Sequence, residues 1–365
     1  MDQTIIAALR RAAEHRQRFD TSFAAYFDAL TDPAGGGALD GLQHGTFPAR
    51  ALELLRDMSL RGGKRLRVAV LYEAATLITD QPAPGLTEAA IGIELLQTHG
   101  LVHDDVIDGS AVRRGAPSVP QRYLDEHPEQ PRTATGLAVL AGDLAAFLSL
   151  RVLAGADLPP ERAAAMTAEL AGVGATTVLG QFLDLERDFG PVPGLGFLHA
   201  VTEYKTTRYS ILAPLRLGLL AAGADPAPHD AELRRYATAL GIANMLRDDW
   251  LDLFGDPAAV GKSVGSDLRS GRRSYAVRAL LTADLDPAER ALLTAALGDP
   301  DGDEETLDRV RAIGRRHGVD RALQADAERH AGDASAIAGT WYDRWRPDPV
   351  AFFHHLPAWT VTRDH

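Results

Sequence analysis

The chain has 365 residues, 45% of them apolar and 24% charged, which is enough to bury a sizeable hydrophobic core. Its formal net charge of −12 and pI of about 5.5 argue against a nucleic-acid partner. The absence of cysteine excludes disulfides, cysteine-based metal sites and a cysteine nucleophile.

The hydrophobic periodicity is helical along almost the whole chain. Apolar residues that recur every three or four positions predict helices over 3–30, 48–60, 65–79, 85–108, 133–155, 159–187, 197–222 and 228–253. Less regular patterns predict helices over 273–298, 303–338 and 348–361. Alternating runs of β-branched residues are nearly absent. The sequence therefore predicts an all-α fold.

The breaks between these helices are short loops, such as "TDPAGGGALDG" (31–41) and "GADPAPHD" (223–230). None has the length or composition of a domain linker, which predicts one helical domain over 1–365. The N-terminal segment lacks the pattern of a signal peptide, and no uninterrupted apolar stretch approaches the roughly 18–20 residues of a membrane span. The most apolar segment carries Asp143 in its middle. We therefore expect a cytoplasmic protein without a membrane span.

Two acidic clusters of the form D-D-x-x-D lie near the ends of apolar helices, each followed by basic residues. The first is in "HDDVIDGSAVRRG" (103–115), and the second is in "RDDWLDLFGDPAAVGKSVGSDL" (247–268). On a helix, about 100° of rotation per residue brings the three carboxylates of such a motif within an arc of about 100°. Carboxylates this close repel one another, and Mg²⁺, which prefers a few hard oxygen ligands plus water and phosphate, relieves the repulsion. One copy also fits a solvated helix end, but two copies with nearby bases favour a site for a metal-bound polyphosphate.

With these residues the chain resembles the trans-isoprenyl diphosphate synthases, or polyprenyl synthetases. The resemblance runs over nearly the whole chain and rests on five segments in the order of the family. They are "GGKRLR" (62–67), "LLQTHGLVHDDVIDGSAVRRG" (95–115), "GQFLDL" (180–185), "YKTTRYS" (204–210) and "DDWLDLFGDPAAVGKSVGSDL" (248–268). Each segment alone is weak evidence, whereas the ordered set is specific.

The resemblance implies an isoprenoid synthase type I fold, which is a single large helical bundle around a central cavity, usually in a homodimer. It also implies a head-to-tail condensation in which three Mg²⁺ ions hold an allylic diphosphate. The C–O bond of that substrate ionises, isopentenyl diphosphate attacks the cation, and a proton is lost, which the released diphosphate can accept. Cations beside the leaving group would stabilise its growing charge, and an apolar cavity would keep water from the carbocation.

Carried over by position, the resemblance implies a role for each motif residue. The principal metal ligands would be Asp104, Asp108 and Asp248, supported by Asp105, Asp249 and Asp252. The allylic diphosphate would be held by Arg113, Lys205 and Lys262, and the isopentenyl diphosphate by Lys64, Arg67, Gln97 and Arg114. The path of the developing cation would be lined by Thr206 and Gln181, with Asp184 nearby. The catalytic set would comprise Lys205, Thr206, Gln181, Asp104 and Asp248.

The lysines support these assignments independently. Lysine occurs at only three of the 38 basic positions, and Lys64, Lys205 and Lys262 all fall within the motifs. A compact ammonium acts on phosphate as a point charge where a planar guanidinium is too large. In "RGGKRLR" (61–67), we expect the glycines to turn the backbone tightly and Lys64 and Arg67 to share a face of the following helix, while Arg65 is solvated.

Two features of the sequence bear on rate and product length. Just before the second cluster, Asn244 and Met245 stand where the family usually has Phe-Gln, which would alter the rate or the chain length without removing a metal ligand. Positions 99 and 100 lie about one helical turn before Asp104, where side chains would face the growing product. The bulk of His99 followed by the small Gly100 favours a C20 product, with C15 and C25 as alternatives. His99 also fits a hydrogen-bonded helix histidine with no role in chain length.

Three other functions fit parts of the sequence. A terpene cyclase shares the helical cavity and one D-D-x-x-D, but it needs only one diphosphate site. A metal-dependent phosphohydrolase built on His103-Asp104 would need further histidines at metal-ligand spacing, and only His99 qualifies. A non-catalytic subunit of a two-chain synthase typically lacks the aspartates that this chain keeps.

Overall fold

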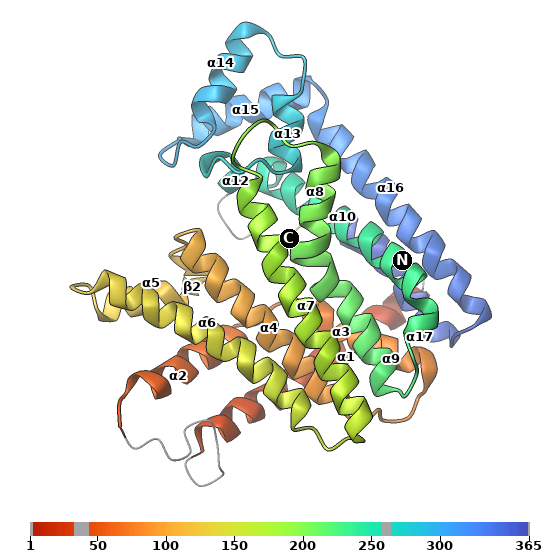
Figure 1. The fold of residues 1–365 in the computed structure, drawn as a ribbon. Helices are drawn as coiled ribbons and strands as arrows, with labels where there is room; N and C mark the ends of the chain where they lie inside the picture. The colour runs from red at the N-terminus through yellow and green to blue at the C-terminus, as the bar shows by residue number, and fades with distance from the viewer. Residues whose placement is uncertain (1–2, 33–43, 257–263, 364–365) are drawn as a thin grey trace. The chain divides into compact units, whose positions relative to one another are not determined.

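The structure is a computed structural model in which residues 3–32, 44–256 and 264–363 are described. Nearly all elements in these ranges are helices, which confirms the predicted all-α class (Figure 1). The chain forms two compact units, one from Met1–Gly174 with Ala213–Pro226 and the other from Ala175–Leu212 with Ala227–His365. The single domain over 1–365 stays a prediction.

The first unit is built around α4 (Leu86–Ile107), whose residues from Ala89 to Thr98 are all buried. Helix α6 (Pro131–Ala154) lies alongside α4 (Figure 1), and it buries small residues that include Ala138, Ala141 and Gly142. Small side chains allow the two backbones to approach closely. The other elements of this unit are α1 (Gln3–Thr31), α2 (Phe47–Leu60), α3 (Leu66–Ile78), α5 (Val119–Glu126), the first part of α7 (Pro160–Glu186) and α9 (Ala213–Ala221).

A small antiparallel hairpin of β1 (Val112–Arg113) and β2 (Ala116–Pro117) interrupts the helices of this unit. Its two-residue turn places both Arg114 and Gly115 at positive φ, 52° and 74°. Turns of this kind match the twist of the strands that they join. The sequence patterns predicted neither this hairpin nor α5, because two-residue strands and an eight-residue helix are too short to show a period.

In the second unit, α10 (Asp230–Phe254) packs along α16 (Val319–Gly339) and against η1 (Thr202–Leu212). The stretch η1 is a π-helix, so the predicted helix 197–222 is divided into α8 (Leu195–Val201), η1 and α9. A cluster of large side chains, Tyr236, Trp341 and Phe353, is fully buried. The remaining elements are the last part of α7, η2 (Ala227–His229), α12 (Ser266–Arg269), α13 (Tyr275–Leu281), α14 (Pro287–Ala296), α15 (Glu304–Arg316), η3 (Thr340–Asp343) and α17 (Pro347–Thr362).

Two more of the predicted helices are divided, each for a local reason. The prediction over 273–298 becomes α13 and α14, because Asp286 and Glu289 form a capping box that starts a new helix. The prediction over 303–338 becomes α15 and α16, separated at Gly318, whose φ of 72° is incompatible with a continuous helix.

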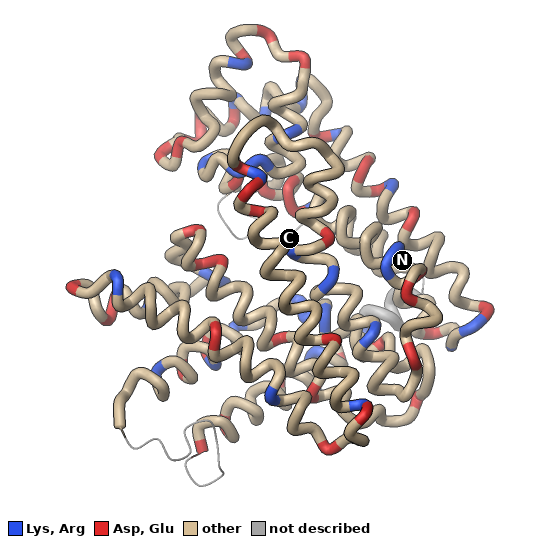
Figure 2. Tube along the Cα trace, in the orientation of Figure 1, with Lys and Arg blue, Asp and Glu red and all other residues tan. Residues whose placement is uncertain are grey.

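Within the described ranges, two helices, α6 and α7, are long and apolar enough to span a membrane by length and composition alone, with mean hydropathies of 1.9 and 1.2 over 18 residues. Figure 2 shows few charged residues along α6. Only 39% and 22% of these segments are buried in the structure. The exposed apolar side chains include Leu140 and Phe147 on α6, and Leu179 and Phe182 on α7.

Candidate active site

The first aspartate cluster lies at the C-terminal end of α4, as predicted. Asp108 is the C-cap residue and is exposed, Asp104 is half-buried, and Asp105 is fully buried. Asp105 accepts hydrogen bonds from Arg113 Nε at 2.8 Å and Nη2 at 2.5 Å, while its second oxygen is buried without a hydrogen-bond partner among the described residues. Burial raises the pKa of Asp105, and the Arg113 guanidinium opposes that rise.

The hairpin brings the basic segment 61–67 next to this cluster. Arg61 Nη1 donates to the carbonyl oxygens of Arg113, at 3.2 Å, and Pro117, at 2.7 Å, on the two strands. A Cβ placed on Gly63 would lie 3.4 Å from Arg114 Nη2, so the arginine lies directly beside this glycine. The structure therefore brings together the two segments that carry the residues expected to hold isopentenyl diphosphate.

Two expectations for "RGGKRLR" are wrong. Helix α3 begins at Leu66, so the exposed Lys64 lies in the loop before the helix and shares no helical face with Arg67. Arg65 is not solvated, since only 4% of it is exposed. The predicted tight turn is present, because Gly62 and Gly63 have φ values of 86° and 133°.

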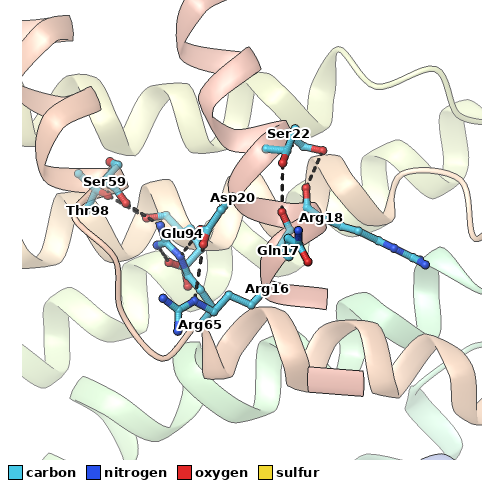
Figure 3. Close-up of polar contacts among 10 residues, drawn as sticks. Arg16, Gln17, Arg18, Asp20, Ser22, Ser59, Arg65, Glu94 and Thr98 are labelled. Atoms are coloured by element: carbon cyan, nitrogen blue, oxygen red, sulfur yellow. Dashed lines mark hydrogen bonds and ion pairs between the residues drawn. The ribbon is translucent and has the colours of Figure 1, made fainter. Parts of the chain in front are cut away.

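Figure 3 shows what Arg65 contacts instead of solvent. Its guanidinium donates to Glu94 Oε2 at 2.5 Å, to Asp20 Oδ1 at 2.9 Å and to the Ser59 carbonyl at 2.7 Å. The adjacent Ser59 and Thr98 hydroxyls are 2.8 Å apart. This arginine ties α1, α2 and α4 together behind the loop that carries Lys64.

The other predicted residues on α4 precede Asp104. Gln97 is buried, and His99 is partly buried with its Nδ1 3.1 Å from the Gly142 carbonyl oxygen. A Cβ placed on Gly100 would meet no heavy atom of the described chain within 4 Å. The hydrogen bond fits the interpretation of His99 as a hydrogen-bonded helix histidine with no role in chain length. The space beside Gly100 fits the interpretation in which the growing product passes this position.

The second cluster lies in the last turns of α10. Asp248 is the most exposed of its three aspartates, with 46% of the side chain accessible. It accepts from Asn244 Nδ2 at 3.1 Å and from Arg363 Nη2 at 2.6 Å. Arg363 also donates to Asn244 Oδ1 at 3.0 Å, so the residue that replaces the usual Phe helps to orient Asp248.

The two other aspartates of this cluster are buried and bonded to the protein. Asp249 accepts from the Tyr275 N–H at 2.7 Å, and Asp252 accepts from the Ser266 hydroxyl at 2.6 Å and the Asp267 N–H at 3.1 Å. Burial, together with the neighbouring Asp267, raises the pKa of Asp249 well above its usual value.

A cavity of about 150 Å³ in the second unit is lined in part by Asp184, Lys205, Thr206, Met245 and Asp249. Lys205 Nζ donates to Asp184 Oδ2 at 2.6 Å. Burial would raise the pKa of Asp184, but Lys205 and a second ion pair, with Arg187 at 2.9 Å, hold the pKa below its usual value. The predicted neighbourhood of Lys205, Thr206 and Asp184 is therefore present.

Gln181 does not line this cavity, and its Nε2 is buried without a hydrogen-bond partner among the described residues. The sequence patterns missed Arg187, which lines the cavity together with Arg272. Arg187 lies outside the segments that carried the resemblance. Lys262 falls outside the described residues, so its assignment stays a prediction.

The six aspartates differ in exposure in a way that suits a metal. Asp108 is exposed and Asp104 and Asp248 are partly exposed, whereas Asp105, Asp249 and Asp252 are 0%, 6% and 5% exposed. The more accessible three are those that the resemblance names as principal ligands. The buried three accept hydrogen bonds from the protein, as the partly exposed Asp248 also does. An all-oxygen donor set with buried supporting carboxylates is the chemistry that Mg²⁺ prefers, so these residues fit the ion that the resemblance implies.

Comparisons with known proteins agree with the family resemblance. The profile of the family described as polyprenyl synthetase matches residues 49–313. The chain is 30% identical over 273 residues to a farnesyl diphosphate synthase of Geobacillus stearothermophilus, covering 72% of this chain and 81% of the relative. It is 31% identical over 231 residues to farnesyl diphosphate synthase of Escherichia coli, covering 61% and 73%.

A crystal structure of geranylgeranyl pyrophosphate synthase from Corynebacterium glutamicum, complexed with isoprenyl diphosphate and magnesium, is similar to this one. Its TM-score is 0.85 at 25% identity, and the alignment covers 96% of this chain and 99% of that one. The family match spans most of the chain, and the motifs lie in the family's order within it. The chain therefore belongs to the polyprenyl synthetase family, the trans-isoprenyl diphosphate synthases, and is a prenyltransferase.

Proposed function

We propose that this protein catalyses the Mg²⁺-dependent head-to-tail condensation of isopentenyl diphosphate with an allylic diphosphate, giving a short trans-prenyl diphosphate. The observation that supports this most is the pairing of accessible and buried aspartates at the ends of α4 and α10. Bound Mg²⁺ would neutralise charge on the diphosphate leaving group, and the ligands would be Asp104, Asp108 and Asp248. The number of ions, three, follows from the family resemblance alone.

The protein's own residues account for binding and orientation. Arg113 holds Asp105 and reaches the same end of α4, so its charge lies where an allylic diphosphate would be bound. Lys205 adds an ammonium in the cavity of the second unit, and Thr206 and Met245 line the same cavity. Cations placed in advance stabilise the departing diphosphate more than the bound substrate, which is the difference that accelerates ionisation.

A second diphosphate site distinguishes a synthase from a terpene cyclase, which is the alternative function. Lys64 comes from the loop, Arg67 from the start of α3 and Arg114 from the hairpin, which Arg61 joins to the start of the loop. We assign these three bases, with Gln97, to isopentenyl diphosphate. A cyclase has no second diphosphate to bind and would have no use for them.

The product length that we propose is C20, with C15 and C25 as alternatives. His99 is held to Gly142 by a hydrogen bond, while Gly100 adds no side chain to the space beside it. A position without a side chain, directly after a bulky residue, would let the growing prenyl product pass along one face of α4.

The test is an incubation of the protein with Mg²⁺, isopentenyl diphosphate and each of the C5, C10 and C15 allylic primers, followed by measurement of product length. We expect isopentenyl diphosphate to be consumed and a C20 product to predominate. Cyclic hydrocarbon from a single prenyl diphosphate, with no isopentenyl diphosphate consumed, would favour the cyclase.

In the same assay, Asp104→Asn and Asp248→Asn should each lower kcat at least about a hundredfold, because each removes a charged ligand from the leaving-group site. The control is Asp157→Asn, an exposed aspartate outside both clusters, which should leave kcat unchanged. Near-normal turnover by either cluster variant would overturn the assignment of the metal ligands.

We also propose that the working assembly is a homodimer. The exposed apolar side chains of α6 and of the last part of α7 support this proposal, because a helix that is apolar on both its inner and outer faces is normally covered on both.

A further inference from the structure

A histidine pair and an aspartate in the first unit form a cluster to which the proposed reaction assigns no metal ion. His99 and His103 lie four residues apart on one face of α4, and Asp143 faces them from α6. The candidate ligand atoms of the three residues all lie within 4.8 Å of one another. We propose that these residues form a binding site for a divalent transition-metal ion such as Zn²⁺, separate from the aspartate clusters.

The separation of one pair of candidate ligand atoms fits such an ion. His103 Nε2 lies 3.4 Å from Asp143 Oδ1, which is long for an N–H···O hydrogen bond. Two ligands bound tetrahedrally at about 2.0–2.1 Å from one Zn²⁺ ion are themselves about 3.3–3.4 Å apart. The separation of this pair therefore already matches a metal site. A rotation of the partly exposed His103 and Asp143 side chains would bring their ligand atoms to the same spacing from His99.

The contacts of His99 leave one ring nitrogen ready to bind a metal. Its Nδ1 is 3.1 Å from the Gly142 carbonyl oxygen, and a carbonyl only accepts, so Nδ1 carries the proton. Nε2 then keeps its lone pair. A hydrogen bond from the other ring nitrogen to a backbone carbonyl is the usual way in which a metal-binding histidine is oriented. Burial, followed by the nearby His103, lowers the pKa of His99.

The close packing of α4 on α6 explains why the three residues meet. A Cβ on Gly142 would collide with the His103 ring, so the absence of a side chain there lets the imidazole lie against the α6 backbone. His103 Nε2 is also 3.3 Å from the Val139 carbonyl oxygen, one turn before Asp143. An ion bound at Nε2 would replace this hydrogen bond and require the tautomer with the proton on Nδ1. The His103 and Asp143 side chains remain 29% and 47% exposed in the single chain.

The donor set selects the kind of ion. Two imidazole nitrogens and one carboxylate suit Zn²⁺, Co²⁺ or Ni²⁺, whereas Mg²⁺ prefers oxygen ligands throughout. An excess of Mg²⁺ would therefore fill the aspartate clusters without competing for this site. A bound ion would link α4 to α6 in the turn before Asp104 and would stabilise the first unit.

The experiment uses Co²⁺, whose visible absorption reports its ligands. Chelator-treated protein is placed in excess Mg²⁺ and titrated with Co²⁺, and Zn²⁺ is then added. We expect one Co²⁺ per chain, with the intense absorption of a four- or five-coordinate ion with nitrogen ligands, and displacement by Zn²⁺. Asp143→Asn and His103→Gln should each weaken binding at least about tenfold. The matched control is His127→Gln, in the same unit, which should bind as the unchanged protein does.

Two results would overturn the proposal. One is a weak, octahedral all-oxygen spectrum in the unchanged protein. The other is loss of the signal in Asp104→Asn together with its retention in Asp143→Asn, which would place the ion at the aspartate cluster. Thermal unfolding supplies an independent readout, since Zn²⁺ should raise the Tm of the unchanged protein but not of Asp143→Asn. Equal melting temperatures in the presence of chelator would show that the Asp143→Asn variant is folded.

Discussion

At the residue scale, Arg65 and Lys64 are neighbours with opposite surroundings. Arg65 is buried with three acceptors, and its guanidinium also lies 5.2 Å and 5.6 Å from the ring centroids of Phe19 and Phe23. A planar group with five donors can satisfy these partners at once, which a lysine ammonium cannot do. Lys64 is exposed in the loop. In "RGGKRLR", Arg61 and Arg65 therefore hold the structure, and Lys64 and Arg67 remain the candidates for substrate.

We predict that Arg65→Gln lowers the free energy of unfolding by about 3–5 kcal/mol, because it leaves the buried Glu94 carboxylate without its cation. Urea denaturation measures the change. The control is Arg56→Gln, which breaks an ion pair with Asp28 whose side chains are 43% and 66% exposed, and it should change the free energy by less than about 1 kcal/mol. Equal effects of the two substitutions would contradict a structural role for Arg65.

We predict that Lys64→Ala raises the KM for isopentenyl diphosphate at least about tenfold, since a charge-assisted contact to phosphate contributes about 1.5–3 kcal/mol. The KM for the allylic substrate should stay within about twofold. Steady-state kinetics with each substrate varied in turn measures both. A parallel loss for both substrates would count against the assignment of Lys64 to one diphosphate.

At the element scale, the π-helix η1 depends on its contact with the last part of α7. Eleven residues, Thr202–Leu212, have the wider π winding, which usually occurs as single turns and often at functional sites. Gly180 on α7 lies against the backbone of η1, and a Cβ there would fall 2.5 Å from the Lys205 Cα. The glycine thus lets the two backbones approach closely enough for Lys205 to reach Asp184.

We predict that Gly180→Ala lowers kcat at least about tenfold by displacing η1 and separating Lys205 from Asp184. Kinetics together with thermal unfolding separates this effect from loss of the fold. The same helix offers a matched control in Gly172→Ala. A Cβ at Gly172 meets no atom of the described chain within 4 Å, and alanine in a helix is about 0.5–1 kcal/mol more favourable than glycine. The control should keep full activity with equal or higher stability, and the same behaviour from Gly180→Ala would refute the close-contact argument.

At the scale of the whole molecule, we propose that the exposed apolar side chains of α6 and α7 form the contact of the homodimer. Phe147 is 72% exposed and Phe182 is 66% exposed, although both are large apolar side chains. The alternative partner for such faces is a membrane, which length and composition alone would allow. Asp143 lies four residues before Phe147, near the middle of α6, and a charge there disfavours a lipid partner.

We predict that the unchanged protein has the mass of a dimer when size-exclusion chromatography is combined with light scattering. Phe147→Glu should shift the mass toward that of a monomer. The control is Tyr342→Glu, which places the same charge at another exposed aromatic residue, and it should remain dimeric. A monomeric unchanged protein, or one recovered with vesicles rather than in solution, would contradict the homodimer.

The sequence by itself determined the helical class, the positions of most helices and the residues of both aspartate clusters. These features depend on local spacing, which hydrophobic periodicity and motif order record directly. The breaks between helices were less predictable from the sequence. The capping box at Asp286 and the left-handed Gly318 each end or start a helix within a few residues, which is too short to alter a hydrophobic period.

Only the tertiary structure decided which charged residues are buried and what each one meets. Arg65 pairs with Glu94, which is 29 residues away, and His103 meets Asp143, which is 40 residues later. Such contacts arise when helices pack, and no local pattern encodes them. The division of the six aspartates into accessible and buried carboxylates has the same origin, because it depends on what covers each side of α4 and α10.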